Sequence, residues 1–203
     1  MTARGHLHGQ AKKNVCHSRS EEIIKEARLE DVIYTEEDYY ALPEERRAEL
    51  IEGVFYDMAV PSEAHQRILM DLATDINNYI RGKKGDCRIY PAPFAVRLFK
   101  DDKTIVEPDI SVICDKDKIT EKGCNGAPDW VIEILSPSNQ WHDTSKKLRL
   151  YMTARVREYW IVDPEEETVT VYSLADNDYR VSIHTFEDSI RAGIYEDLTI
   201  KIK

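Results

Sequence analysis

The chain lacks the features that mark several classes of protein. No apolar run among its 203 residues approaches the roughly 18 residues of a membrane-spanning helix, and none near the start could act as a secretory signal. Its four cysteines include no C-x-x-C pair and follow no metal-site spacing; they are Cys16, Cys87, Cys114 and Cys124. We therefore expect reduced thiols, a cytoplasmic protein and no membrane segment.

The composition is that of a globular domain. Hydrophobic residues make up 42% of the 203 residues and charged residues 33%, which suits one domain of ordinary size. Residues 1–20 contain no acid and few apolar residues, so we predict a flexible leader there and a single domain over 21–203. The net charge of −10 is uneven, since residues 81–103 hold seven bases against three acids, and residues 140–157 hold five against one. Such basic segments matter only if they flank a site that needs cations.

The order of predicted elements indicates an α+β domain with a mixed central sheet. Ser62 is placed to cap a long helix over 62–82, whose apolar residues form one stripe. The other predictions are a short helix after Thr35, strands over 54–60, 88–99, 104–114, 129–135 and 157–163, a polar loop over 116–127, a helix over 142–154, a hairpin of 168–173 with 179–185, and a last strand at 198–202. The strand–helix–strand order over 129–163 predicts a parallel crossover.

Two strands of this predicted sheet carry acids where packing alone favours valine. Alternation over 104–114 puts Glu107 and Asp109 on one face, and Glu133 lies inside the apolar run 129–135. A carboxylate in a central strand costs several kcal/mol unless a salt bridge, a raised pKa or a metal ion compensates it. A divalent cation with oxygen ligands would relieve the repulsion between Asp109 and Glu133. The alternative is that each acid lies at a strand end and is solvated.

Several strings in the same order resemble one known family. They are VEPDISVI at 106–113, GAPDWVIEILSPS at 126–138, KLRLY at 147–151 and VREYWIVDP at 156–164, with ELIEG at 49–53 and Pro61-Ser-x-x-His65-Gln66 before them. They resemble the Uma-type family of putative restriction endonucleases, of the PD-(D/E)xK nuclease superfamily, from about residue 33 to the end. The resemblance implies a restriction-endonuclease-like fold, which is a mixed central sheet flanked by helices, here with a C-terminal β-hairpin extension.

The resemblance also implies a catalytic site. Asp109 matches the first acid of the family motif and Glu133 the second, and both would bind Mg²⁺, for which Mn²⁺ can substitute. The motif lysine should follow Glu133 by two residues, but Leu135 stands there, and the matching lysine is Lys147 of the next helix. The remaining matches are Glu52, an acid of the first helix that would complete the metal shell, and three accessory residues, His65, Gln66 and Glu107.

The function so implied is endonucleolytic hydrolysis of DNA phosphodiester bonds, without an organic cofactor. Basic side chains of the two basic segments would contact the phosphates, namely Lys83, Lys84, Lys146 and Arg149. Two sites that cut two strands would suit a homodimer.

Other interpretations stay open at this point. A catalytically inactive DNA-binding or protein-interaction domain of the same fold would explain Leu135 and the net acidity. Lys146 and Lys147 could simply lie on an exposed helix face. A glycoside hydrolase with Glu133 as its general acid would need an aromatic cleft, whereas Trp130 and Trp160 are predicted to be core residues.

Overall fold

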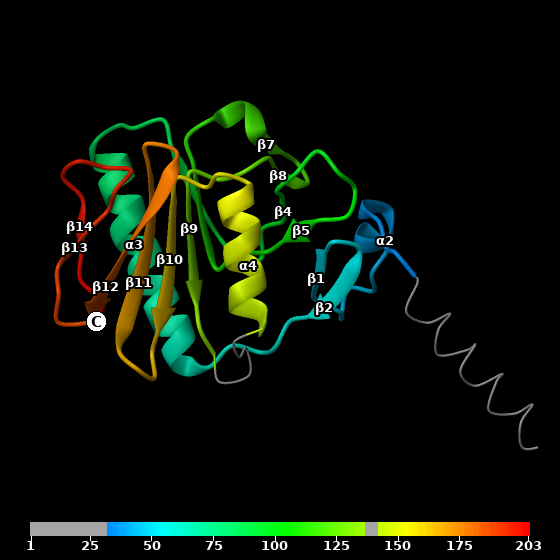
Figure 1. Ribbon diagram of the computed structural model, residues 1–203, viewed down its shortest axis with the longest axis horizontal. Coiled ribbons are helices and arrows are strands. Elements are labelled where there is room, and N and C mark those ends of the chain that lie inside the picture. The colour runs from blue at the N-terminus through cyan, green and yellow to red at the C-terminus, as the bar shows by residue number, and fades with distance from the viewer. Residues whose placement is uncertain (1–31, 137–141) are drawn as a thin grey trace, which may run out of the picture.

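A mixed six-stranded sheet between two helices forms the centre of the molecule (Figure 1). The computed structural model describes residues 32–136 and 142–203, with the side chains of 142–144 left out, so the predicted leader over 1–20 lies outside the described residues. The order of the central strands is β12 (Asp178–Thr185), β11 (Thr168–Ala175), β10 (Glu158–Asp163), β9 (Trp130–Ile134), β6 (Ile110–Ile113) and β3 (Arg88–Pro91). The predicted α+β fold with a mixed sheet is confirmed.

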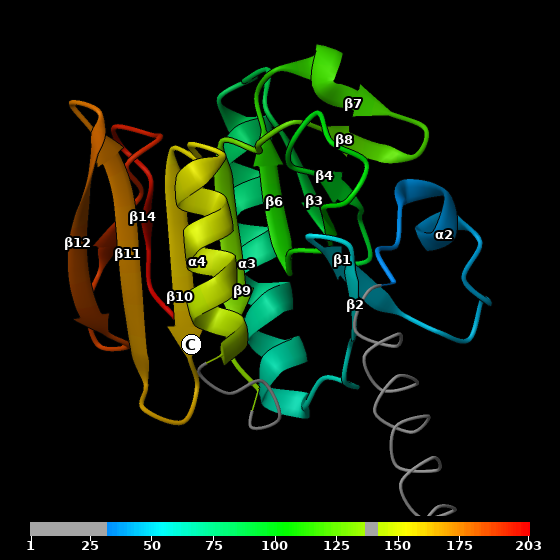
Figure 2. The same ribbon diagram turned by 45° about the vertical axis from the view of Figure 1, so that its right-hand side comes forward.

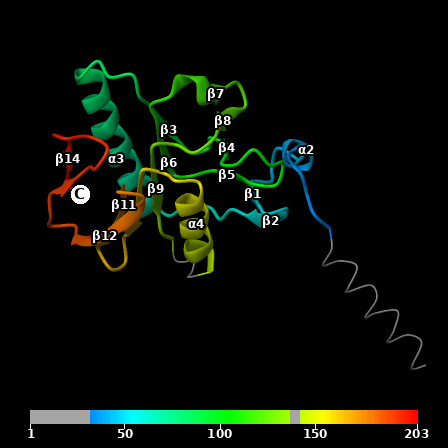
Figure 3. The same cartoon turned by 45° about the horizontal axis from the view of Figure 1, so that its top comes forward.

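The parallel crossover is also confirmed. Strands β9 and β10 pair in parallel, with Glu133 opposite Ile161, and α4 (His142–Thr153) connects them across one face of the sheet (Figure 2). The other face carries α3 (Glu63–Gly82), which begins where the Ser62 hydroxyl accepts a hydrogen bond from the backbone N–H of His65. Figure 3 shows α3 and α4 on opposite sides of β9.

A second six-stranded sheet, which the sequence did not predict, lies beside the first one. Its strand order is β2 (Val54–Asp57), β1 (Ala48–Ile51), β5 (Ile105–Val106), β4 (Val96–Arg97), β8 (Gly123–Asn125) and β7 (Ile119–Thr120), with the short helices α2 (Glu36–Tyr40) and η1 (Lys116–Lys118) nearby in the chain. The predicted polar loop over 116–127 was therefore wrong, because it contains β7 and β8.

Two predicted strands divide between these sheets. The segment 88–99 supplies β3 to the central sheet and β4 to the second one, and the segment 104–114 supplies β5 and β6 in the same way. The second break falls at Glu107-Pro108-Asp109, where proline has no N–H to donate to a strand ladder. Asp109 therefore stands at the point where the chain passes from one sheet to the other, and not inside a continuous strand.

The segment that carries Glu52 is a hairpin. Strands β1 and β2 pair up to Ile51 opposite Val54, so Glu52 and Gly53 form a two-residue turn with φ of 51° and 82°. Two positive φ angles are the geometry that favours a tight hairpin. The predicted helical position of Glu52 was wrong, and so was the length of the strand predicted over 54–60, which ends at Asp57.

Each face of the central sheet has its own core. Trp130 and Trp160 contact each other edge to face, both fully buried, on the side of α3, as predicted for core residues. The C-terminal strands β13 (Ile190–Arg191) and β14 (Thr199–Ile200) pack into this core through buried isoleucines. On the other side, Tyr151 of α4 packs against Tyr159 of β10. The predicted hairpin of β11 and β12 is confirmed.

Two of the cysteines form a disulfide bond, Cys87–Cys114, so the expectation of reduced thiols was wrong for this pair. The pairing follows from the sheet, because β3 and β6 are antiparallel neighbours with Arg88 opposite Ile113, which brings the adjoining cysteines together. Cys124 is a free, buried thiol. Within the described ranges, no helix has the length and apolar character needed to cross a membrane.

Candidate active site

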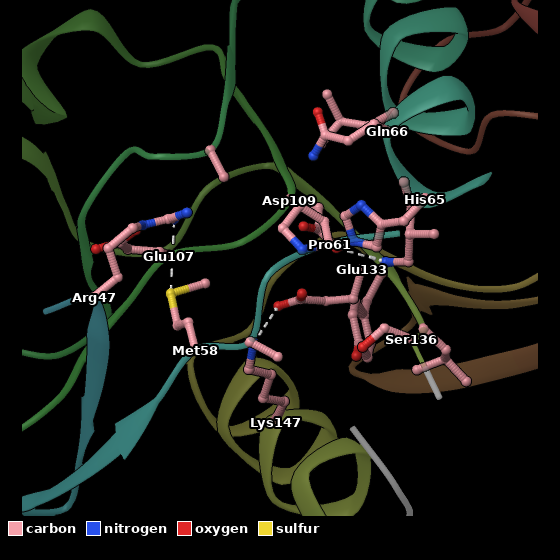
Figure 4. Close-up of a pocket in the computed structure, with 16 residues that line it drawn as sticks. Arg47, Met58, Pro61, His65, Gln66, Glu107, Asp109, Glu133, Ser136 and Lys147 are labelled. Atoms are coloured by element: carbon pink, nitrogen blue, oxygen red, sulfur yellow. Dashed lines mark hydrogen bonds and ion pairs between the residues drawn. The ribbon is translucent and has the colours of Figure 1, made fainter. Parts of the chain in front are cut away.

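A pocket opens where β5 passes into β6, between the first turn of α3 and the middle of α4 (Figure 4). Its polar lining comes from both sheets and both helices and consists of Arg47, His65, Gln66, Glu107, Asp109, Glu133, Ser136 and Lys147. The structure thus brings most of the predicted site residues to one place.

Asp109 links three elements at this pocket. Its Oδ2 accepts a hydrogen bond of 2.8 Å from the backbone N–H of Ile134 in β9 and lies 3.1 Å from Nε2 of His65 in α3. These two partners fix the carboxylate just before the first residue of β6. Oδ1 of Asp109 has no hydrogen-bond partner in the described part of the chain, so one oxygen of a held carboxylate remains available to a ligand.

Glu133 lies on the face of β9 that α4 covers. Oε1 of Glu133 accepts a 2.6 Å hydrogen bond from the Tyr151 hydroxyl and lies 3.1 Å from Nζ of Lys147. Lys147 and Tyr151 are four residues apart, so one face of α4 presents both of them to the same carboxylate. Figure 4 shows Lys147 pointing toward Glu133. The side chain of Lys147 is only 9% exposed, which rules out the alternative that it lies on a solvated helix face.

A third acid completes this arrangement. Oε2 of Glu49, in β1, lies 2.9 Å from Nζ of Lys147, and the other oxygen of Glu49 accepts a 2.8 Å hydrogen bond from the backbone N–H of Glu107. Lys147 therefore bridges two buried carboxylates that come from different sheets. One ammonium cannot neutralise both Glu49 and Glu133, and this leaves excess negative charge at the pocket.

The pKa values follow from this excess of charge. Burial raises the pKa of Glu133 to about 8. The charge of Lys147 opposes this shift, and the charges of Asp109 and Glu49 reinforce it. Burial lowers the pKa of His65, but the hydrogen bond to Asp109 and the charges of Asp109 and Glu133 outweigh it, so that pKa is raised. A further positive charge would therefore stabilise the site.

The remaining acid of the lining, Glu107, is held by two side chains. Its Oε1 accepts a 2.7 Å hydrogen bond from the Tyr39 hydroxyl, and its Oε2 accepts one of 2.7 Å from Nη2 of Arg47. Both oxygens are therefore used within the protein. Gln66 also lines the pocket, with an exposed side chain on the first turns of α3.

The donor set at the pocket fits a hard divalent cation. No group of three or more His, Cys, Asp or Glu side chains in the described ranges is arranged to hold a metal ion. Mg²⁺, however, keeps several waters and is commonly bound through one or two carboxylates. Asp109 and Glu133 each line the pocket, and Oδ1 of the first and Oε2 of the second accept no hydrogen bond from the described residues. Carboxylate oxygens together with water are the kind of ligands that Mg²⁺ takes.

Glu52, which was predicted as a third metal ligand, lies outside the pocket. It stands in the β1–β2 turn with a side chain 54% exposed, and its carboxylate pairs with Arg149 at 2.8 Å. Arg149, one of the predicted DNA contacts, is thereby occupied. Lys146 binds the Tyr56 hydroxyl and lies 4.1 Å from the centre of that ring.

Lys83 and Lys84 lie far from the pocket. His65 is in the first turn of α3 and Lys83 follows its last residue, which separates them by about 27 Å of helix. Lys83 pairs with Asp197. The two lysines are therefore not part of the pocket, and their predicted contact with DNA stays a prediction.

Sequence reasoning missed Glu49, Tyr151 and Arg47. Glu49 is flanked by Ala48 and by Leu50, and a strand assignment for 48–51 would have marked it as a buried acid needing a partner. Tyr151 follows Lys147 by four residues on the same helix, a spacing that places both on one face. No local pattern marks Arg47, which reaches the pocket through Glu107.

Comparison with known proteins gives consistent results. The family model Uma2, described as putative restriction endonuclease, matches residues 36–201. The uncharacterized protein slr1290 of Synechocystis sp. is 28% identical over 144 residues, which cover 70% of this chain and 74% of that protein. A crystal structure of a putative nuclease of DUF820 from Anabaena variabilis matches with a TM-score of 0.67 and 25% identity, over 82% of this chain and 94% of that one. Both the family and the structural neighbour support a nuclease function.

Proposed function

The chain belongs to the Uma2 family of putative restriction endonucleases, and we propose that it is a Mg²⁺-dependent endonuclease that hydrolyses phosphodiester bonds of DNA. The observation that carries this proposal is the position of Lys147. Its amine comes from α4 to within 3.1 Å of Glu133, in the pocket that Asp109 also lines. The usual position of this lysine, two residues after Glu133, holds Leu135.

The proposed roles follow from the geometry. Asp109 and Glu133 would hold Mg²⁺ through the carboxylate oxygens that accept no hydrogen bond from residues 32–136 and 142–203. Bound Mg²⁺ would supply Lewis acidity toward a phosphate oxygen and a lower pKa for a coordinated water. Lys147 would orient the attacking water or neutralise charge that develops on the phosphate, which a long side chain with three N–H donors can do. The ion pairs with Glu133 and Glu49 fix the amine in place.

His65 would position Asp109. Its Nε2 contact holds the carboxylate on the α3 side while the backbone of Ile134 holds it on the β9 side. A catalytic carboxylate fixed by two partners needs little reorganisation when a ligand binds. Gln66, one residue further along α3, has an exposed amide at the pocket and could contact the substrate directly.

The inactive domain of the same fold remains the competing proposal, and Leu135 is the observation that favours it. An inert domain needs no cation, however, and would gain stability if hydrophobic residues replaced the buried Glu49–Lys147–Glu133 group. A homodimer that cuts both strands, and Mn²⁺ as a substitute metal, also belong to the proposal.

Nicking of supercoiled plasmid DNA by the purified protein tests the function. We expect nicking with Mg²⁺ or Mn²⁺ that EDTA stops and that Asp109→Asn and Lys147→Met each abolish. Asp86→Asn is the matched control, because Asp86 is an exposed acid paired with Lys116 outside the pocket lining. Nicking that survives in both pocket variants would refute this site. Absence of nicking in a wild-type protein that still binds Mn²⁺ would favour the inactive domain.

A further inference from the structure

The basic side chains at the pocket differ in how exposed they are and in how many of their nitrogens already have a partner. Among the described residues that line it, the basic side chains are Arg47, His65 and Lys147. Both His65 and Lys147 are buried. Nζ of Lys147 lies against Glu49 and Glu133, and Nε2 of His65 lies against Asp109, while Nδ1 of His65 is buried without a hydrogen-bond partner among the described residues. Arg47, in contrast, has a side chain that is 44% exposed.

The guanidinium of Arg47 is anchored through one nitrogen. Nη2 donates to Oε2 of Glu107 at 2.7 Å and lies 3.7 Å from the sulfur of Met58. Neither Nε nor Nη1 has a hydrogen-bond partner among the residues that the structure describes. One edge of a planar group with five N–H donors is thus held, and the remaining donors are available to a ligand.

The surroundings of Arg47 fix this orientation. The backbone N–H of Met58 donates to the carbonyl of Arg47 at 2.9 Å, which ties the residue to the β1–β2 hairpin. Glu107 is itself held by the Tyr39 hydroxyl at its other oxygen. The guanidinium is therefore placed at the pocket before any substrate arrives, and Figure 4 shows it across the pocket from His65.

The charge of the pocket explains why a substrate phosphate needs this residue. Asp109 and Glu133 would repel a phosphodiester, and the net charge of the protein is −10. Arg149, which pairs with Glu52, and Lys83, which pairs with Asp197, do not line the pocket. A planar guanidinium matches phosphate geometry and can donate two parallel hydrogen bonds.

We propose that Arg47 binds a backbone phosphate of the nucleic acid at this pocket, and that Glu107 is a positioning residue that orients its guanidinium. The inference rests on the proposed function, since it names the contact by which that site takes hold of its substrate. It names a phosphate contact inside the pocket, whereas the predicted contacts Lys83, Lys84 and Arg149 lie outside its lining.

Arg46 offers a matched control. It is the neighbouring arginine, its side chain is likewise 44% exposed, and it pairs with Asp57 at 2.7 Å outside the pocket lining. Arg46→Gln and Arg47→Gln therefore remove the same charge from adjacent positions, so an effect of net charge alone would be equal in both variants.

The experiment measures binding of a fluorescein-labelled 20-bp DNA duplex by anisotropy, with Ca²⁺ present, over a series of salt concentrations. For Arg47→Gln we expect a Kd about tenfold higher and a slope of log Kd against log salt smaller by about 0.9, the value for one phosphate contact. Arg46→Gln should keep the wild-type Kd and slope. Glu107→Gln, which leaves the charge of Arg47, should raise KM for plasmid cleavage while the salt slope and kcat stay near the wild type.

Each outcome decides the inference. Thermal unfolding shows whether the Arg47→Gln protein is folded. If the folded variant binds the duplex with the wild-type Kd and slope, the role of Arg47 is overturned. Cleavage by the wild-type protein would still support the nuclease function in that case. If Arg47→Gln does not fold, Arg47→Lys is the variant to test, because it keeps the charge but loses the planar guanidinium. A Kd several-fold higher than that of the wild type, with an unchanged salt slope, would support the inference. An unchanged Kd would overturn it. A wild-type protein that neither cleaves nor binds the duplex refutes both proposals.

Discussion

Two buried glutamates in neighbouring strands of the central sheet have different surroundings. Glu158, at the start of β10, is fully buried and accepts hydrogen bonds from Nε1 of Trp160 and the backbone N–H of Ile194, both at 2.7 Å. Glu133, in β9, lies against the amine of Lys147, shares its pocket with Asp109 and keeps one oxygen without a hydrogen-bond partner among the described residues. Burial raises the pKa of both acids.

The comparison shows that burial of an acid, or a raised pKa, does not by itself mark a functional site. Both oxygens of Glu158 are satisfied by neutral donors, and its hydrogen bond to Ile194 holds the C-terminal segment onto the sheet. Glu133 is surrounded by further acids and by an incompletely compensating lysine. Glu133 differs from Glu158 in two respects: other charges surround it, and one of its oxygens is open to a pocket. These two features distinguish a candidate site from a buried acid that only stabilises the fold.

The largest expected difference between the two glutamates is in activity. Glu133→Gln should reduce DNA cleavage by at least about 100-fold, because it removes a charge that acts in the transition state. Glu158→Gln should keep cleavage within a few-fold of the wild type. Initial rates on a fluorescent duplex, with both variants checked for folding by circular dichroism, measure the ratio. Equal losses in the two variants would mean that Glu133 is as structural as Glu158.

Removal of the lysine should have the next largest effect, on stability. Lys147→Met leaves Glu49 and Glu133 buried without their cation, which costs about 3–5 kcal/mol in free energy of unfolding. Urea denaturation of the metal-free protein measures this free energy of unfolding. The control is Lys116→Met, which removes an exposed ion pair with Asp86 and should change stability by about 1 kcal/mol or less. Adding Glu133→Gln to Lys147→Met should restore part of the loss. A single variant as stable as the control would contradict the buried bridge.

Glu158→Ala should destabilise the protein by about 2–3 kcal/mol, because the buried donors of Trp160 and Ile194 lose their acceptor. The specific activity of the folded fraction should not change. Urea denaturation together with the cleavage rate per folded molecule measures both quantities. A loss of activity without a loss of stability would assign Glu158 to the site instead of the core.

The smallest expected difference is in the dependence of stability on pH. The pKa of Glu133 is raised from 4.5 to about 8, so the folded state holds a proton between these values that the unfolded state has released. Stability from this group is therefore fully present below pH 4.5 and is lost as pH rises through about 8. Glu133→Gln should flatten this decline, and the raised pKa of Glu158 should leave a residual slope of the same sign. Urea midpoints from pH 5 to 8.5 that fall equally in both proteins would contradict the assignment.

Local patterns predicted the central layer of the fold. The apolar stripe of α3, the strand–helix–strand unit of β9, α4 and β10, and the β11–β12 hairpin each arise from residues close together in the sequence. The second sheet was not predictable in this way, because β4, β5 and β7 have two residues each and pair with distant segments. The same holds for the disulfide, whose cysteines meet only through the pairing of β3 with β6.

The candidate site was only partly predictable for the same reason. Asp109 and Glu133 were singled out as acids in predicted strands, and Lys147 was found through the family resemblance. The structure brings all three to one pocket. Glu52 was predicted because it matches an acid of the family pattern, whereas in strand β1 the buried acid is Glu49. Clustered lysines were expected to bind DNA near the site. The number of charges in a sequence segment, however, does not show which end of the 20-residue helix α3 these charges occupy.

Calorimetric titration of the metal-free protein with Mn²⁺ tests the central claim most directly. The account predicts that heat of binding is seen with the wild type, disappears in Asp109→Asn and in Glu133→Gln, and persists in Glu158→Gln. Equal Mn²⁺ binding by the wild type and the two pocket variants, or none by the wild type, would contradict a metal site formed by the two strand carboxylates.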